Sequence, residues 1–349
     1  DVCSSDLTLE IHNSSNIGKG DVILEDTATL VIDDTIIIEG SMVLPSGTVD
    51  VDLASLTIEG HLEGAGSLRA RGSGTESTLF IEGVSSTNTG AISVEKATLK
   101  ATAIDSLGVS PAVTLSDADL VLLQESAATL SLQGEGNVTF PSTGTANVNI
   151  NSDFEGGITL LGGTVDMTEA GGALNLSEIS FEGTSETPTL SLQDHIETKT
   201  SLSFNEYGGI IDVASGVTVS FTGDVEVSSS LVPFTKTGDG DLLMIMNNFE
   251  RGGDGADIII DQGGLITDTT FVESSPIAIE TGAELRLNQA SAGSYYGSSS
   301  GGTISGAGVV VVEGSGPLNL LVPEEGSTQL VNTYEGGTVL KGTVFITDD

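Results

Sequence analysis

The stretch NTYEGGTVLKGTV, residues 332–344, joins an asparagine, an aromatic residue, a Gly-Gly pair and two short strand-like segments separated by glycine. Three earlier segments, which start at Asn151, Asn205 and Asn248, repeat this order. Glycine adopts the positive φ angles that tight corners need, and Val, Ile and Thr favour strands. The pattern therefore predicts short strands joined by glycine corners. The residues that define the four copies are Phe154, Gly156 and Gly157; Tyr207, Gly208 and Gly209; Phe249, Gly252 and Gly253; and Tyr334, Gly336 and Gly337.

Strand patterns also cover the rest of the chain. Residues 49–53 and 218–221 alternate between apolar and polar side chains, and residues 36–38 and 309–312 are unbroken β-branched runs. Helical periodicity is nearly absent. Short strands of this kind fit a sandwich, a barrel or a stacked solenoid, and the internal repeats favour the solenoid. We therefore predict an all-β protein, a single elongated parallel β-helix (β-solenoid) with roughly 20 residues per turn.

The segment at 332–344 resembles the autotransporter-associated β-strand repeat of secreted bacterial passenger domains. The sequence KTGDGDL at 236–242 is similar to the strand that leads into that repeat. The resemblance covers roughly residues 145–345, where the clearest copies lie. It implies a right-handed parallel β-helix that is exported and displayed on the bacterial cell surface.

The charge balance excludes several classes of partner. Ten Lys and Arg oppose 50 Asp and Glu, which gives a formal net charge of −40. Nucleic-acid binding requires clustered basic residues, and so does binding to an anionic membrane surface, so we expect neither. No apolar run approaches the length of a membrane-spanning helix, so we expect no membrane insertion of this segment. An acidic surface is instead expected to limit aggregation of a β-rich protein.

The beginning of the chain is interpreted separately. Residues 1–7 resemble the translation of a sequencing-library adapter, and we treat them as a non-native segment; a native first strand is the competing interpretation. The only cysteine, Cys3, lies in this segment, so no disulfide framework is expected. Near-absence of cysteine fits a bacterial surface protein. Residues 8–349 are expected to form one continuous β-solenoid.

Catalysis finds little support in the sequence. The chain has three histidines, His12, His61 and His195, which are far apart and have no metal-binding spacing. Polysaccharide lyases or hydrolases of the β-helix class are the competing enzyme hypothesis, because Asp33-Asp34 and Gly60-His61 resemble parts of their motifs. However, Leu62 follows His61 where such hydrolases have glycine, and no Arg-x-Lys occurs. We therefore predict that the chain is not an enzyme.

Calcium is the one cofactor that the sequence suggests. Residues 252–260, GGDGADIII, fit the nonapeptide of calcium-binding β-rolls. Ca²⁺ prefers six to eight oxygen ligands, which Asp carboxylates and corner carbonyls can supply. A β-roll site is built between consecutive copies, however, and the chain has one copy, so the motif also fits a plain acidic corner. The candidate ligands are Asp239, Asp241, Asp254 and Asp257.

These observations favour an extracellular structural protein, the subunit of a surface filament or the stalk of an adhesin. Strand-like residues lie close to both ends of the chain, at 7–11 and 343–347, and no capping segment is visible. Either caps lie in sequence outside this chain, or neighbouring subunits cover the ends and form a homopolymer. Two further hypotheses stay open: a passenger adhesin that binds surface glycans or a host surface, and a polysaccharide lyase or hydrolase.

Overall fold

The computed structural model describes residues 8–11, 19–25, 27–74, 76–151, 153–169, 173–227, 234–245, 249–251, 258–267, 276–289, 294–296, 303–314, 318–322, 333–341 and 344–348. Residues 1–7, interpreted above as adapter-derived, lie outside this set, as do His12 and six residues of the 252–260 motif, residues 252–257, which include Gly252, Gly253, Asp254 and Asp257. What the sequence predicts for these residues stays a prediction.

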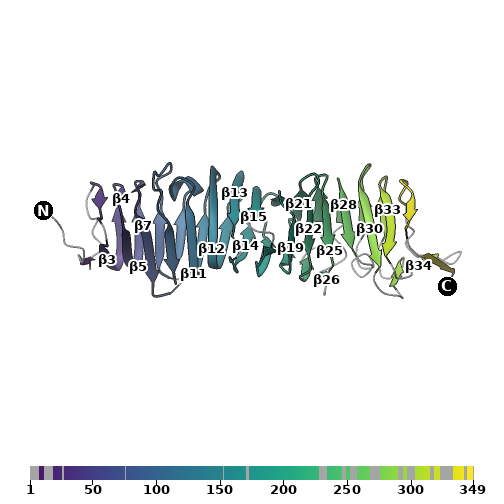
Figure 1. Ribbon diagram of the computed structural model, residues 1–349, viewed down its shortest axis with the longest axis horizontal. Coiled ribbons are helices and arrows are strands. Elements are labelled where there is room, and N and C mark those ends of the chain that lie inside the picture. The colour runs from purple at the N-terminus through teal and green to yellow at the C-terminus, as the bar shows by residue number, and fades with distance from the viewer. Residues whose placement is uncertain are drawn as a thin grey trace. The chain divides into compact units, whose positions relative to one another are not determined.

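The chain packs into two compact units, unit 1 (Asp1–Gly171) and unit 2 (Gly172–Asp349). Within each unit, strands from successive turns lie side by side (Figure 1) and pair in parallel. The described residues contain one short 3-10 turn, Ile104–Ser106, and no α-helix. The predicted fold class, a parallel β-solenoid, is thereby confirmed. In the described part of the chain, no helix is long and apolar enough to cross a membrane.

The described strands of unit 1 form three ladders, named sheets 1 to 3, and the longer strands bend from sheet 1 into sheet 2. Sheet 1 contains β1 (Thr8–Ile11), β7 (Ser67–Gly72), β9 (Ile92–Glu95), β13 (Thr145–Ile150) and β15 (Thr164–Glu169). Sheet 2 contains β8 (Thr78–Ile81), β10 (Thr98–Ala101) and β14 (Gly157–Leu160). The strands shared by sheets 1 and 2 are β3 (Thr29–Ile38), β5 (Thr48–Ile58), β11 (Ala112–Leu122) and β12 (Ser126–Phe140). Sheet 3 contains β2 (Val22–Ile23), β4 (Met42–Leu44) and β6 (Leu62–Gly64).

The described strands of unit 2 are short and form four ladders, named sheets 4 to 7. Sheet 4 contains β18 (Thr189–Leu192), β21 (Gly209–Val213), β24 (Phe234–Thr237), β27 (Ile258–Ile260), β29 (Ile277–Ile279) and β32 (Ile304–Gly306). Sheet 5 contains β17 (Glu178–Phe181), β20 (Ser201–Phe204), β23 (Val225–Val227) and β26 (Phe249–Arg251). Sheet 6 contains β16 (Ala173–Leu174), β19 (Ile196–Thr198), β22 (Thr218–Phe221), β25 (Asp241–Met244), β28 (Gly264–Thr267), β30 (Glu284–Gln289), β33 (Val309–Gly314) and β35 (Thr338–Leu340). Sheet 7 contains β31 (Ser294–Tyr296), β34 (Leu318–Val322) and β36 (Val344–Asp348).

The core of each turn is built from alternate side chains of its strands. In β3, Ile36 and Ile38 are fully buried, whereas Ile37 between them points outward and is half-buried. Residues in register on neighbouring parallel strands point to the same side of a sheet. Apolar residues therefore form columns from turn to turn, such as Leu30 on β3 and Val51 on β5, which are both fully buried. These columns hold the stack together by burying apolar surface.

The connection between sheets 1 and 2 in unit 1 is called the first corner. Successive turns pass it at residues 33–34, 54, 72–74, 96–97, 116–117, 135–136 and 153–156. The strand register shifts here: the β3–β5 pairing skips between Ile32 and Thr35, and the β11–β12 pairing skips between Ser116 and Ala118. The extra residues turn the chain without breaking the strand, as in a β-bulge. Several charged side chains at the first corner, such as Asp33, Lys96 and Asp117, are exposed.

Candidate functional site

The first copy of the predicted repeat forms part of the first corner, between β13 and β14. Phe154 is fully buried there, and its backbone N–H donates to the carbonyl of Asn151 at 2.9 Å. A Cβ on Gly156 would overlap the carbonyl oxygen of Gly136 on the preceding turn. Gly157 then begins β14. The aromatic residue of this copy is therefore a core residue, and its glycine allows two turns to approach closely.

The second copy lies between β20 and β21. The N–H of Tyr207 donates to Oδ1 of Asn205 at 2.9 Å, and Gly208 follows with a φ of 65°. Gly209 packs against two stacked rings, those of Phe181 and Phe204, whose centroids are 4.5 Å apart. A Cβ on Gly209 would lie 2.5 Å from the Phe181 ring and 2.7 Å from the Phe204 ring. An aromatic column in the core, rather than the corner alone, thus requires glycine at this position.

The last two copies are described in part. Phe249 begins β26, and the Gly-Gly pair after it, residues 252–253, lies outside the described residues. In the fourth copy, the hydroxyl of Tyr334 is hydrogen-bonded to that of Thr338 at 2.5 Å. A Cβ on Gly336 would overlap the backbone of the preceding turn, and Gly337 has a φ of 87°. The repeat residues described here therefore build corners of the solenoid.

A lysine lies in the core at the start of the KTGDGDL motif. Lys236 is 0% exposed, and its ammonium group donates to the carbonyls of Thr237 and Gly238 at 2.6 Å and of Gln262 at 3.1 Å. Three carbonyl acceptors match the three N–H donors of an ammonium group. Lys236 thereby ties two successive corners of unit 2 together from the inside.

The surroundings of Lys236 change its titration. Burial lowers the pKa of its ammonium group to about 8, against the opposing influence of four carboxylates. Those carboxylates, in order of their effect, are Asp212, Asp241, Asp239 and Asp261. Burial disfavours the charged form because the ammonium group loses its water, and nearby negative charge restores part of that loss. Two of the predicted calcium ligands, Asp239 and Asp241, thus lie in the electrostatic field of a buried cation.

The carboxylate of Asp241 is engaged by an arginine. Nη1 of Arg286 lies 3.1 Å from Oδ2 of Asp241, and Nε of Arg286 lies 2.9 Å from Oε2 of Glu284. Asp239 is exposed on the same corner. No group of three or more His, Cys, Asp or Glu that could hold a metal occurs within the ranges described. Because Asp254 and Asp257 fall outside those ranges, calcium binding at this motif stays a prediction.

The histidines and the acidic pair considered for catalysis lie on different parts of the fold. Asp33 lies at the first corner, whereas His61 is exposed at the corner before β6. His195, in unit 2, accepts a hydrogen bond at Nδ1 from the backbone N–H of Thr218 at 2.9 Å. The structure therefore does not join Asp33 with His61 in one site.

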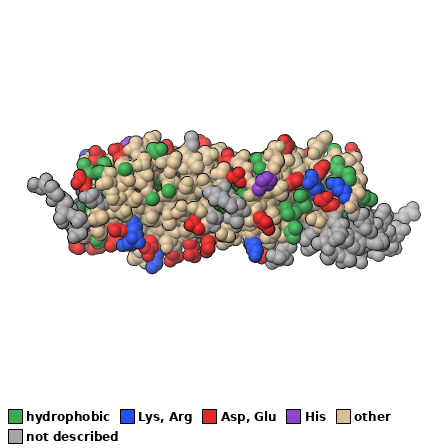
Figure 2. Space-filling view, in the orientation of Figure 1, with side chains coloured by type: hydrophobic (Ala, Val, Ile, Leu, Met, Phe, Trp, Pro, Cys, Tyr) green, Lys and Arg blue, Asp and Glu red, His purple; other side chains and the backbone are tan. Residues whose placement is uncertain are grey.

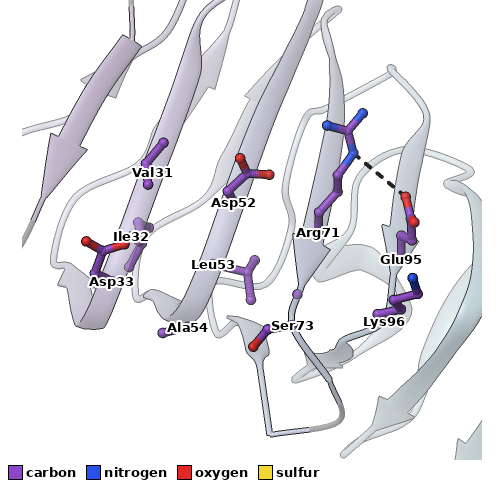
Figure 3. A pocket seen from close by; sticks show the side chains of 11 residues that line it. Val31, Ile32, Asp33, Asp52, Leu53, Ala54, Arg71, Ser73, Glu95 and Lys96 are labelled. Carbon is purple, nitrogen blue, oxygen red and sulfur yellow. Dashed lines mark ion pairs between the residues drawn. The ribbon is translucent and has the colours of Figure 1, made fainter.

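A polar hollow of about 510 Å³ opens at the first corner across β3, β5, β7 and β9. Its polar lining consists of Asp33, Asp52, Arg71, Ser73, Glu95 and Lys96 (Figure 3). The middle of the hollow is formed by Ala54 and Gly72, whose small size leaves space. Gly72 cannot be larger, because a Cβ there would overlap the backbone of Lys96.

Ion pairs organise the sheet 1 side of this hollow. Arg71 lies one turn after Asp52 and one turn before Glu95 in the strand register. Its Nε is 3.7 Å from Oε2 of Glu95, and its Nη2 is 3.5 Å from Oδ1 of Asp50. All three side chains are slightly more than a third exposed, between 34% for Asp50 and 39% for Glu95. Such half-exposed pairs contribute little to stability.

Among the residues that the structure describes, core columns end at β1 in unit 1 and at β35 in unit 2. On β1, Leu9 is in register with the fully buried Leu30 but is itself 42% exposed. On β35, Leu340 is in register with Val312, which is 2% exposed, yet Leu340 is 57% exposed. Both leucines continue a buried column into solvent.

Comparison of the chain with models of known protein families finds no match, and no curated protein or solved structure matches it.

One repeat of unit 1 was missed by the sequence interpretation. The triplet Ile-Glu-Gly occurs at 38–40, 58–60 and 81–83, and its isoleucines pair in register on consecutive turns. A Cβ on Gly60 would overlap the backbone of Gly40, so this glycine column lets the turns stack closely. The spacing of the triplets was a signal that could have located these turns.

Proposed function

We propose that the chain is an extracellular structural β-solenoid, the subunit of a surface filament or the stalk of an adhesin, which associates end to end. The observation that carries this proposal is the exposure of Leu9 and Leu340. Each continues a column of core side chains, and exposed core positions of this kind favour association with another apolar surface. A neighbouring copy can cover Leu340 with its own Leu9.

Strand pairing supports the same association. In the described part of the chain, β1 pairs with β3, and β35 pairs with β33, and each pairing uses one edge of the terminal strand. A free strand edge presents unpaired N–H and C=O groups that can accept a further strand. Both pairings are parallel, so β35 of one copy can pair in parallel with β1 of the next, which would join sheet 6 of one copy to sheet 1 of its neighbour. Contacts of this head-to-tail kind propagate as a fibre.

The surface location is the second part of the proposal. It rests on the resemblance of residues 332–344 to autotransporter-associated repeats, on the near-absence of cysteine and on the net charge of −40. Repulsion between acidic subunits limits lateral aggregation of such a fibre.

We also propose that the chain acts without a catalytic centre of its own. Support comes from the separation of Asp33 and His61, the residues that most resemble a polysaccharide-hydrolase motif, onto different corners. Turnover of acidic or neutral polysaccharides that is lost in Asp33→Ala or His61→Ala would contradict this part of the proposal.

Electron microscopy of the purified chain tests the structural proposal directly. We expect fibres whose length increases with protein concentration, in which the first turn of one copy contacts the last turn of the next. Isolated particles at high protein concentration, with Leu9 and Leu340 still accessible to solvent, would overturn it.

A further inference from the structure

Three backbone carbonyls of unit 2 converge on one point inside the solenoid. The ammonium group of Lys236 donates to the carbonyl oxygens of Thr237 and Gly238 at 2.6 Å and to that of Gln262 at 3.1 Å. Thr237 ends β24 and Gly238 begins the corner that leads to β25, whereas Gln262 lies in the corner of the next turn, between β27 and β28. We call these three oxygens the carbonyl cage. Two successive turns thus enclose a single positive charge.

The backbone of the two corners shapes the carbonyl cage. Gly238 has a φ of 73° and Gly263 has a φ of 67°, both in the left-handed region that glycine adopts readily. A Cβ on Gly263 would lie 2.5 Å from the carbonyl oxygen of Gly238, which is itself part of the cage. The two corners can therefore approach this closely because position 263 has no side chain.

Lys236 departs from the core column in which it lies. It is in register with Ile211 on β21 and with Ile260 on β27, and both isoleucines are fully buried. The stem of a lysine can pack like an apolar side chain, but burial of its charge costs free energy unless that charge is compensated. Because isoleucine fills the same position on both neighbouring turns, packing alone does not account for a lysine here. The carbonyl cage is what distinguishes this position.

Negative charge surrounds the carbonyl cage. The carboxylates of Asp212, Asp241, Asp239 and Asp261 favour the charged form of the buried ammonium group. Asp239, Asp261 and Gln262 are exposed, so the cage lies close to the surface of the corner. Neutral oxygens at contact distance and carboxylates around them are what a small hard cation requires.

We propose that the carbonyl cage is a binding site for a monovalent cation, which the chain occupies with its own ammonium group. Potassium and ammonium ions carry the same single charge as the lysine head, and carbonyl oxygens can replace the hydration shell of such an ion. Ca²⁺ prefers six to eight oxygens, carboxylates among them, whereas the three acceptors of the ammonium group are neutral carbonyls. Asp239 and Asp241 then act as counter-charges of Lys236 rather than as ligands of Ca²⁺.

A tethered cation makes this corner independent of the ions in solution. A free ion loses translational freedom when it binds, whereas the ammonium group is already attached to the chain. The corner therefore keeps its cation at any ion concentration, unlike a β-roll corner, which takes Ca²⁺ from the medium. The proposal does not depend on end-to-end association.

Lys236→Met tests whether a free ion can replace the ammonium group. Methionine retains most of the apolar stem but places no N–H donor in the carbonyl cage. We measure melting temperatures near pH 7 in potassium, ammonium and tetramethylammonium chloride at matched ionic strength. Tetramethylammonium has the same charge but is too bulky for a cage that fits an ammonium group.

We expect the parent to respond equally to the three salts, because its cage is filled and the salts act by screening. In Lys236→Met, potassium and ammonium should raise the melting temperature by about 2 °C or more above the value in tetramethylammonium. This excess should grow with the logarithm of the ion concentration, as expected for binding to the folded state.

A second pair of variants tests the counter-charges and retains the lysine. Figure 2 shows red Asp and Glu side chains spread over the visible face, with few blue Lys and Arg side chains among them. Removal of an acid should therefore usually relieve repulsion and raise the melting temperature at low salt. Asp224→Asn is the control of this kind, because Asp224 is exposed and lines a hollow with Glu178 and Glu226. Asp239→Asn should instead lower the melting temperature, because the buried ammonium group loses a counter-charge.

Three results would overturn the cation site. They are equal melting temperatures of Lys236→Met in potassium and tetramethylammonium, a stabilisation of this variant by Ca²⁺ that exceeds that by potassium at matched ionic strength, and an increase in melting temperature in Asp239→Asn as large as that in Asp224→Asn. Circular dichroism shows whether each variant is folded. If Lys236→Met unfolds in every salt, a free ion fails to replace the ammonium group, and this also counts against the site.

Discussion

Arg286 reaches across an entire turn of unit 2 to bind Asp241. The two residues lie on β30 and β25, and β28 runs between these strands. The contact of 3.1 Å forms because Gly264 is in register with both Asp241 and Glu284 and has no side chain in the path of the guanidinium. Burial alone lowers the pKa of Arg286, but the hydrogen bond to Glu284 and the charges of Asp241, Glu284 and Glu313 outweigh it and raise the pKa.

Replacing Gly264 by alanine should therefore destabilise unit 2. The new Cβ would overlap Oδ1 of Asp241 and displace its carboxylate from Arg286. Overpacking of this kind lowers the free energy of unfolding by about 1–3 kcal/mol, measured by urea denaturation. Gly74→Ala is the control, because no atom lies within 4 Å of its added Cβ. In an Asp241→Ala background, Gly264→Ala should lower the free energy of unfolding much less. An equal decrease in that background would contradict the explanation.

The buried lysine predicts an unusual pH dependence. Lys236 has a folded-state pKa of about 8, below its ordinary value of 10.5. Between these two pH values the unfolded chain binds a proton that the folded chain has released. The free energy of unfolding must therefore rise with pH in this window, by about 1.5 kcal/mol between pH 8 and pH 9.5. Well below pH 8 the contribution is constant, because the lysine is then protonated in both states.

Urea denaturation at a series of pH values measures this rise. Lys236→Met removes the titrating group and should abolish the rise, although it also lowers stability at every pH because three carbonyls lose their donor. Lys199→Met is a matched control, since Lys199 is exposed and its removal should leave the rise unchanged. A parent protein whose stability is flat from pH 8 to pH 9.5 would show that the ammonium group is not buried as described.

The net charge predicts a stabilising effect of salt. Stacked turns bring carboxylates closer together than the Debye length of about 8 Å at physiological ionic strength, so screening relieves their repulsion. We expect Ca²⁺, Mg²⁺ and Na⁺ at matched ionic strength to raise the melting temperature by similar amounts. Differential scanning calorimetry measures the effect. A larger rise with Ca²⁺ that Asp257→Ala abolishes would instead support a specific site near residues 252–260.

The fold could be predicted because it depends on local patterns. The alternation in residues 49–53 and 218–221 and the glycine pairs at 156–157 and 208–209 specify strands and corners wherever they occur along the chain. The side of each strand that faces the core follows from the same alternation. No contact between distant residues had to be known.

The contacts between turns could not be predicted, because turn length varies. Leu132 is in register with Ile150, whereas Val310 is in register with Thr338, so the spacing between partners changes along the chain. The pairing of Arg286 with Asp241 depends on this spacing. Lys236 was missed for a different reason: lysine is usually exposed, and only the ring of corner carbonyls makes its burial tolerable.

The end-to-end association makes its most specific prediction at Leu340. In β35 the N–H of Lys341 bonds to the carbonyl of Val312, and the N–H of Val310 bonds to the carbonyl of Gly337. Because backbone groups alternate between the two edges of a strand, the N–H of Leu340 points away from β33, toward the free edge. Leu340→Pro removes this donor together with the exposed apolar side chain and leaves the bonds to β33 in place.

We therefore expect Leu340→Pro to abolish fibres or shorten them severely without unfolding the solenoid, as followed by electron microscopy and circular dichroism. Leu340→Thr is the matched control, because it removes apolar surface but keeps the N–H. It should weaken association less than proline does, since it loses only the burial of the leucine side chain. Fibres of unchanged length in Leu340→Pro would show that β35 is not the contact and would refute end-to-end strand addition at this edge.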